Sequence, residues 1–164
     1  MIISVGVDEE LQFVLCNEEM LDDGARLLSQ NHRYLRGEGL SLLPQRFEEI
    51  GHARQALSAI LHQPKAMGLA ALSGGKLMAY LIGCPEVNAI RGRHVWIHPA
   101  GMGADTSCSL EIMRDLYARL GVIWVKNGFF DHFALTLAQQ DRLEPWLKLG
   151  FGYEQAHALL DLEK

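Results

Sequence analysis

Two histidines, His94 and His98, are four residues apart, a spacing that can bind zinc when both side chains lie on one face of a helix. The segment that contains them is strand-like. On a strand the two side chains share a face but are about 13 Å apart along the chain. One ion cannot contact both, and the other five histidines show no ligand spacing. We therefore expect two independent histidines and no metal site.

The three cysteines, Cys16, Cys84 and Cys108, are odd in number, widely spaced and without a CxxC pair. This usage indicates no disulfide framework and is typical of a reducing compartment, so we expect a cytoplasmic protein. Cys108 lies near the predicted start of a helix, where a thiol pKa can fall. No histidine or aspartate stands at a recognisable spacing from it. We interpret all three cysteines as small buried side chains.

The triplet Gly101-Met102-Gly103 lies between a predicted strand and a predicted helix. Phosphates bind at such positions through backbone N–H groups and the helix dipole. A plain turn explains these three residues equally well. The sequence contains neither a GxxxxGK(S/T) motif nor a GxGxxG motif that opens a βαβ unit.

The elements that would position these residues follow from the spacing of apolar side chains and from turn signals. Strands are predicted at residues 11–16, 66–72, 77–84, 93–98, 129–137 and 156–162. Residues 31–43, which include Gly37 and Gly39, are predicted as a loop. Helices are predicted from an Asn17 cap to Gln30, from Pro44 to Gln63, from Leu110 to an Asn127-Gly128 end, and from an Asp141–Glu144 capping box to Gly150.

This order of elements predicts an α/β (α+β) fold with a mixed central sheet and helices on both faces. The Gly74-Gly75 pair between two apolar runs indicates a β-hairpin and hence antiparallel strands. The later strand-helix-strand units imply crossovers and some parallel pairing. No repeat or linker divides the chain, so we expect one domain over residues 1–164.

The bulk composition excludes several classes of function. Of the 164 residues, 49% are hydrophobic and 21% are charged, which argues against disorder. The net charge is -5, so nucleic acid is not an expected partner. No apolar run approaches the length of a membrane span, and the N-terminus lacks the features of a signal peptide. We therefore expect no membrane partner.

The run Trp146-Leu147-Lys148-Leu149-Gly150-Phe151 resembles the Y-E-K-L-G-F signature that follows the fifth strand of GNAT acetyltransferases. The order of elements also resembles that family, and the likeness covers nearly the whole chain. Residues 116–120 and 124–128 additionally resemble one degenerate repeat of tandem-GNAT proteins. This second likeness suggests a homodimer, in which another copy would replace the missing repeat.

The resemblance implies that acetyl-coenzyme A is bound by a loop after the fourth strand and by the residue seven positions before the family's tyrosine. The positions that match are Ile97, His98, Pro99, Gly101, Met102, Gly103 and Gln139. The family has glutamine or arginine where this chain has His98. Asp105 adds an acid where the pyrophosphate should bind, and it would repel that anion unless it points away.

Trp146 occupies the position of the family's tyrosine, which protonates the leaving thiolate. An indole N–H donates a hydrogen bond but is not a useful acid, so Trp146 is not expected to supply that proton. The candidates for a general base are His98, Asp131 and His132. Among them we favour His98, because histidine changes charge near neutral pH.

Two functions follow from the resemblance. The first is transfer of an acetyl group from acetyl-coenzyme A to an amine of a small molecule or a peptide. The second is a catalytically impaired GNAT-fold module for binding, regulation or dimerisation. In the family the first two helices and their loop select the acceptor, and here that region contains Arg33, Tyr34, Arg36 and Glu38.

Overall fold

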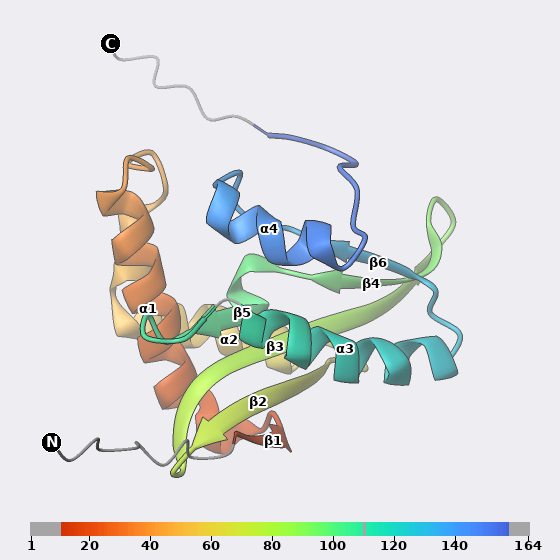
Figure 1. The fold of residues 1–164 in the computed structure, drawn as a ribbon, viewed down its shortest axis with the longest axis horizontal. Coiled ribbons are helices and arrows are strands. Elements are labelled where there is room, and N and C mark those ends of the chain that lie inside the picture. Colours follow the sequence, from red (N-terminus) through yellow and green to blue (C-terminus); the bar gives the residue numbers. More distant parts are fainter. Residues whose placement is uncertain (1–10, 110, 158–164) are drawn as a thin grey trace, which may run out of the picture.

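The computed structural model describes residues 11–109 and 111–157 and contains a six-stranded sheet (Figure 1). The strand order is β1-β2-β3-β4-β6, and β5 pairs separately with β3. All pairs are antiparallel except β4 with β6, which are parallel. The strands are β1 Gln12–Leu15, β2 Met67–Ser73, β3 Lys76–Asn88, β4 Gly92–Ile97, β5 Met102–Ala104 and β6 Asp131–Ala134. The predicted mixed sheet is confirmed.

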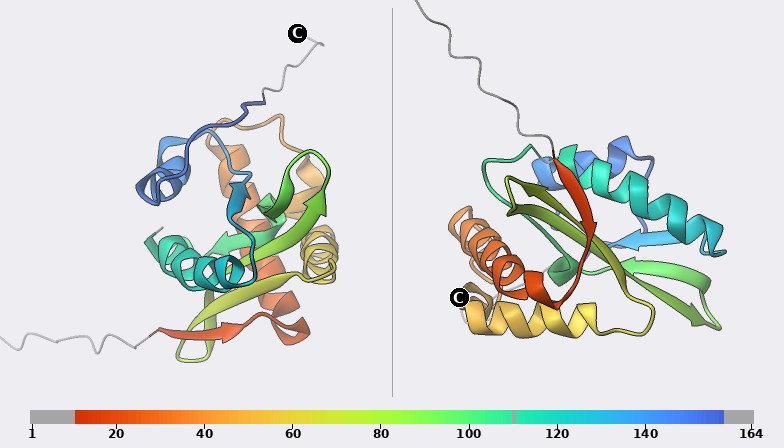
Figure 2. Two further views of the ribbon diagram at one scale, coloured as in Figure 1. Left: turned by 90° about the vertical axis from the view of Figure 1, so that its right-hand side faces the viewer. Right: turned by 90° about the horizontal axis from the view of Figure 1, so that it is seen from below.

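Helices cover both faces of this sheet, as predicted (Figure 2). They are α1 Leu21–Gly37, α2 Ile50–Leu61, α3 Glu111–Lys126 and α4 Gln140–Lys148, with short 3-10 turns η1 Glu18–Met20, η2 Gln45–Glu48 and η3 Pro99–Gly101. Alternate residues of β2 point to opposite faces. Leu69 and Ala71 belong to the core beneath α3, whereas Ala70 belongs to the core beneath α1 and α2.

Several local predictions are confirmed. Asn17 caps the first helical turn by accepting a hydrogen bond from the Glu19 N–H. Gly74 and Gly75 form the hairpin turn with φ angles of 54° and 81°, a region in which glycine is not strained. Gly128 has a φ of 78° just after the end of α3. Both glycine signals therefore have the predicted conformational cause.

The prediction of a loop at residues 31–43 is wrong for its first half, because α1 continues to Gly37. Position 31 faces the interior, and the polar Asn31 there interrupts the apolar pattern. Its side-chain amide donates a hydrogen bond of 3.0 Å to the carbonyl oxygen of Ala104 in β5. A tertiary hydrogen bond thus satisfies a buried position that a hydrophobic pattern cannot detect.

Other boundaries also differ from the predictions. Pro44 precedes η2 rather than the main body of α2. Strand β6 is shorter than residues 129–137, and β3 continues past Cys84 to Asn88. No side chain caps α4, so the predicted Asp141 cap is wrong; Gln139 holds the cap position. Residues 158–162 of the predicted last strand lie outside the described residues, and residues 156–157 are not in a strand.

The glycine triplet is not a loop that leads into a helix. Its first residue ends η3, and Met102 and Gly103 begin β5, which pairs with β3 from Leu81 to Ala79. The preceding pairing of β3 with β4 runs from Asn88 to Cys84, opposite Gly92 to Trp96. Only residues 82–83 of β3 therefore lie opposite residues 97–101. Because the second segment is longer, residues 97–101 form a bulge and the chain bends there.

The two glycines of the triplet are needed for close packing against β3. A Cβ atom on Gly101 would lie 2.7 Å from the backbone oxygen of Ile82, and one on Gly103 would lie 2.6 Å from the ring of Tyr80. Such contacts are shorter than van der Waals separation. The structure thus explains these glycines without invoking phosphate binding.

We predict that Gly101→Ala lowers the free energy of unfolding by about 1–3 kcal/mol, because the backbone of Ile82 cannot move away easily. The matched control is Gly51→Ala in α2, where an added Cβ meets nothing within 4 Å. That control should be neutral or stabilise by up to about 1 kcal/mol. Urea unfolding of both variants tests this, and wild-type stability for Gly101→Ala would contradict the packing of β5 on β3.

Candidate functional site

A cleft opens where β4 and β6 separate. The Leu135 N–H donates a hydrogen bond of 2.9 Å to the carbonyl oxygen of Ile97, which continues the ladder of the two parallel strands. In the described structure no backbone hydrogen bond joins the two segments beyond this point. After the bulge, residues 102–104 pair with β3, whereas residues 135–137 lead towards α4. The gap between them is therefore built by the bulge before β5.

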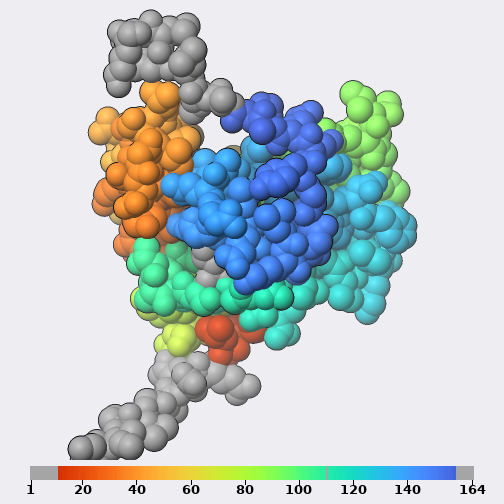
Figure 3. Space-filling model, turned by 45° about the horizontal axis from the view of Figure 1, so that its top comes forward, coloured from red at the N-terminus to blue at the C-terminus, as the bar shows by residue number. Residues whose placement is uncertain are grey.

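Side chains from both layers of the fold enclose a cavity of about 420 Å³ at this gap. Figure 3 shows α1 and its following segment (orange) beside α4 (blue) on the surface above it. The lining is mostly apolar, as is usual for a ligand site. It consists of Leu28, Asn31, His32, Leu35, Leu43, Pro44, Phe47, Ala56, His98, Pro99, Ala100, Met102, Gly103, Ala104, Met113, Leu135, Thr136, Leu137, Arg142, Pro145 and Trp146.

His98 lies at the bulge and contributes to this cavity. Its imidazole stacks on the ring of Trp96, with 6.1 Å between ring centroids and an angle of 27°. Within the described part of the chain the imidazole has no hydrogen bond or ion pair. Both ring nitrogens are thus available for hydrogen bonds to a ligand.

The cavity contains a second histidine, His32, which the sequence analysis missed. Its Nε2 atom lies 2.8 Å from the carbonyl oxygen of Pro44, so the ring donates this hydrogen bond from the Nε2–H tautomer. The ring also packs edge-on against Phe47 at 5.6 Å. These contacts fix the orientation of His32, whereas His98 has only its stacking partner.

The other two candidate bases do not line the cavity. His132 packs under α3, where its Nδ1 accepts a hydrogen bond of 2.7 Å from the hydroxyl of Tyr117. Desolvation lowers the pKa of His132, which favours this neutral accepting form. Asp131 is exposed on β6, opposite His94. His98 is therefore the candidate base that the structure brings to the cleft.

Trp146 forms part of the cavity wall and is only 5% exposed. Its ring packs edge-on against Tyr117 at 5.9 Å and against Phe151 at 5.2 Å. The hydroxyl of Tyr117 is occupied by His132 and is not part of the cavity lining. The structure thus provides no tyrosine hydroxyl at this wall in place of Trp146.

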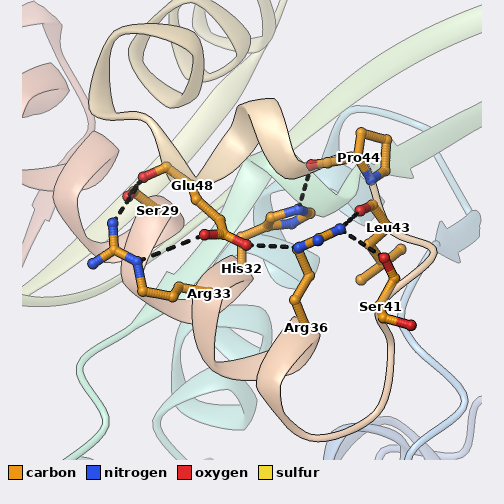
Figure 4. Close-up of polar contacts among 8 residues, drawn as sticks. All are labelled: Ser29, His32, Arg33, Arg36, Ser41, Leu43, Pro44 and Glu48. Atoms are coloured by element: carbon orange, nitrogen blue, oxygen red, sulfur yellow. Dashed lines mark hydrogen bonds and ion pairs between the residues drawn. The ribbon is translucent and has the colours of Figure 1, made fainter.

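Polar contacts between α1 and η2 hold the outer wall of the cavity (Figure 4). Glu48 accepts a hydrogen bond of 2.6 Å from the Nε of Arg36, and its backbone carbonyl accepts one of 2.6 Å from Ser29. Arg36 also donates to the carbonyl oxygens of Ser41 and Leu43. Because Leu43 and Pro44 line the cavity, this network positions the wall residues directly.

The connection from β5 to α3 is unsuited to bind pyrophosphate in the way that the resemblance implies. The Asp105 carboxylate accepts hydrogen bonds from the backbone N–H and the hydroxyl of Ser107 and pairs with Lys76 at 3.0 Å. These contacts, first those with Ser107, lower the pKa of Asp105 to about 2. Its charge is compensated, but the Ser107 N–H is no longer available to a ligand.

The first turn of α3 adds a second acid to this region. Glu111 is ion-paired with Arg114 and also contacts Lys148 at 3.4 Å. The N–H of Glu111 donates to the hydroxyl of Ser109. Both the acidic side chain and this internal hydrogen bond oppose anion binding at the helix start.

The remaining predicted residues lie away from the cavity wall. Ile97 is buried, and its carbonyl makes the backbone bond described above. Gln139 is half-buried at the start of α4 and does not line the cavity. Burial raises the pKa of the Cys84 thiol to about 11, and desolvation also raises that of Cys108. Both thiols are therefore poor nucleophiles.

Among the residues that the structure describes, no group of three or more histidine, cysteine, aspartate or glutamate side chains could hold a metal ion. None of the described helices is both long and apolar enough to cross a bilayer.

Asn31, His32, Thr136 and Arg142 are the polar cavity residues that sequence reasoning missed. Asn31 and His32 were assigned to a loop. The signal for Arg142 was its spacing of four residues from Trp146, which puts both side chains on one face of α4.

Several solved structures with similar folds are described as acetyltransferases. A ribosomal-protein-alanine N-acetyltransferase from Brucella melitensis superposes with a TM-score of 0.64 and 12% identity, over 93% of this chain and 99% of that chain. A predicted acetyltransferase with acetyl-CoA from Clostridium acetobutylicum gives 0.64 and 16%, over 94% and 97%. An aminoglycoside acetyltransferase from an uncultured soil metagenomic sample gives 0.63 and 16%, over 94% and 98%.

The chain has the GNAT acetyltransferase fold. At these identities the likeness is one of architecture. No family model and no curated protein matches the sequence. In this GNAT fold the run Trp146-Leu147-Lys148-Leu149-Gly150-Phe151 forms the end of α4 and the turn after it, where Gly150 has a φ of 89°. That placement agrees with the resemblance of this run to the Y-E-K-L-G-F signature.

We predict that Asp105→Asn lowers the free energy of unfolding at pH 7 by about 1 kcal/mol, since it removes the ion pair and weakens the Ser107 contacts. The folded-state pKa of Asp105 lies below its unfolded value of about 3.9. The stabilisation is therefore complete above pH 4 and is lost as the pH falls towards 2.

Urea unfolding at pH 7, 4 and 3 should show the gap between wild type and Asp105→Asn closing as the pH falls. Asp115→Asn, an exposed position on α3, serves as the control and should shift stability by less than about 0.5 kcal/mol at each pH. A gap that stays constant down to pH 3 would contradict the assigned role.

Proposed function

We propose that the protein transfers an acetyl group from acetyl-CoA to an amine. The observation that carries this proposal is the cleft between the diverging strands, with the unpaired imidazole of His98 at its edge. The similar structures support it, since they are acetyltransferases and one of them contains acetyl-CoA.

The cleft is compatible with the acyl end of the cofactor, whereas the start of α3 is not compatible with its pyrophosphate. Most of residues 98–104 line this mostly apolar cavity, which suits a thin flexible arm. We assign this contact to His98, Pro99, Met102 and Gly103, which line the cavity. Ile97 and Gly101 do not line it and are assigned on the resemblance alone. Gln139 is assigned with them on the resemblance alone. The acids Asp105 and Glu111 predict that any pyrophosphate contact lies elsewhere and is weak.

When bound, the cofactor would supply an activated thioester carbonyl. In this reaction the amine nitrogen forms a bond to the carbonyl carbon, the carbon–sulfur bond breaks, and the amine loses a proton. His98 is placed to accept that proton as general base. Trp146 excludes water from its wall but supplies no proton, so the leaving thiolate takes its proton from solvent. Correct positioning of the two reactants supplies much of the rate.

The acceptor would enter beside α1 and the segment that leads to η2. Leu35, Leu43 and Phe47 give this side an apolar wall. We propose a small-molecule or peptide amine as the acceptor. The related aminoglycoside acetyltransferase has been solved in complex with sisomicin and with trehalose, so this fold admits small polar molecules.

The second candidate function is a GNAT-fold module that binds a ligand or a second copy without catalysis. The observation that favours it is the pair of acids, Asp105 and Glu111, at the position where the family binds pyrophosphate. A homodimer, as suggested by the likeness to one tandem repeat, remains a prediction of this alternative.

Isothermal titration with acetyl-CoA, combined with a thiol-release assay on a panel of amines, tests the proposal. We expect binding and turnover, and we expect His98→Gln to lower kcat/KM by about 100-fold or more while leaving thermal stability unchanged. His32→Gln is the control, because glutamine can keep the hydrogen bond to Pro44. It should change kcat/KM by less than about threefold.

Absence of acetyl-CoA binding at millimolar concentration would refute the enzyme and favour the binding module. A large loss in His32→Gln together with full activity in His98→Gln would show that the base is misassigned.

A second prediction concerns the leaving group. Trp146→Tyr should raise kcat by about 10-fold, since a phenol can protonate the thiolate and an indole cannot. Trp146→Phe is the matched control, because it removes a similar volume without adding a hydroxyl. Equal kcat values for the two variants would show that protonation of the thiolate does not limit the reaction.

A further inference from the structure

Arg142 is a cavity-lining residue whose positive charge is poorly matched by protein groups. Its side chain is only 19% exposed, and its Nε atom is buried without a hydrogen-bond partner. The guanidinium makes no hydrogen bond within the described part of the chain. Its one ion pair, at 3.7 Å, is with the carboxylate of the neighbouring Asp141, which is 58% exposed and therefore well solvated.

The rest of the cavity offers this charge no compensation. None of the lining residues is an aspartate or a glutamate. The polar side chains there, besides Arg142, are those of Asn31, His32, His98 and Thr136. Asn31 and His32 already bond to the backbone carbonyls of Ala104 and Pro44. Among the described lining residues, Arg142 is thus the only permanently charged side chain of a mostly apolar cleft, where an unmatched charge is costly.

We infer that Arg142 binds a carboxylate of the substrate that enters the cleft. A guanidinium offers paired N–H donors that match the two oxygens of a carboxylate. One monoanionic carboxylate balances one arginine, whereas a phosphate dianion in this cavity would leave a negative charge unmatched. The inference rests on the proposed function and narrows it to a reaction whose substrate carries both an amine or acyl group and a carboxylate.

The same charge argues against polycationic acceptors. An aminoglycoside carries several ammonium groups, and a cleft that binds it needs acids in its wall. The described lining has none and contributes a guanidinium of like charge. The acceptor class therefore differs from that of the aminoglycoside acetyltransferases that share the fold.

The carboxylate can belong either to the acceptor, as in an amino acid, or to the acyl group, as in a succinyl thioester. One experiment separates the two. In the first arm, amino acids and their carboxamides are titrated into the protein by calorimetry without any acyl donor. In the second arm, binding of succinyl-CoA is compared with that of acetyl-CoA. Each arm is run on wild type, Arg142→Gln, Arg142→Lys and Arg114→Gln.

In wild type we expect the carboxylate of at least one arm to bind about 10- to 100-fold more tightly than its uncharged counterpart. Arg142→Gln should abolish this preference, and Arg142→Lys should restore part of it. Arg114→Gln is the matched control, because Arg114 also has a buried Nε without a partner but lies on α3 outside the cavity. It should keep the preference.

Equal binding of carboxylates and their uncharged counterparts in both arms overturns the inference, as does a preference that survives in Arg142→Gln. The first arm uses no cofactor, so it gives a result even when acetyl-CoA does not bind. Conversely, acetyl transfer without any preference for carboxylates overturns the inference alone and leaves the proposed function standing.

Discussion

The pairing of β5 with β3 is the constraint on which the site depends. Strand β3 is long enough to pair with β4 and then, beyond a bulge, with β5. The second pairing draws residues 102–104 along β3 and away from the segment that follows β6. The cleft is the space that results. Gly101 and Gly103 make this possible, because only a residue without Cβ fits so close to Ile82 and Tyr80.

Local features of the structure could be predicted from the sequence, whereas features that depend on distant contacts, such as the bulge before β5, could not. Signals that act within a few residues were read correctly, such as the Asn17 cap, the Gly74-Gly75 hairpin and the glycine at the end of α3. The assignment of residues 101–103 failed because their pairing with β3 is a contact between residues that are distant in sequence. Two glycines in the sequence are as typical of a loop as of such a close approach. The length of α1 was missed because Asn31 is buried through a hydrogen bond to β5.

The distribution of charge separates the two ends of the candidate site. At the start of α3, Asp105 and Glu111 are paired with Lys76, Arg114 and Lys148, and they use local N–H groups for internal bonds. At that end, the charges of Asp105 and Glu111 are already balanced by neighbouring basic side chains. In the cleft, the Nε atom of Arg142 is buried without a hydrogen-bond partner, and its charge has only the ion pair with Asp141. The cleft of this acidic protein, whose net charge is -5, thus contains a partly buried cation that protein groups match poorly.

One face of α4 therefore determines two properties of the cleft, since Trp146 and Arg142 are one helical turn apart and both line it. At the position of Trp146 the GNAT family has a tyrosine, which can donate a proton, whereas the indole of Trp146 only packs against its neighbours. Tyr117 cannot take over that role, because its hydroxyl is bonded to His132. For the proposed acyl transfer, neither of these two side chains is a source of the proton for the leaving thiolate.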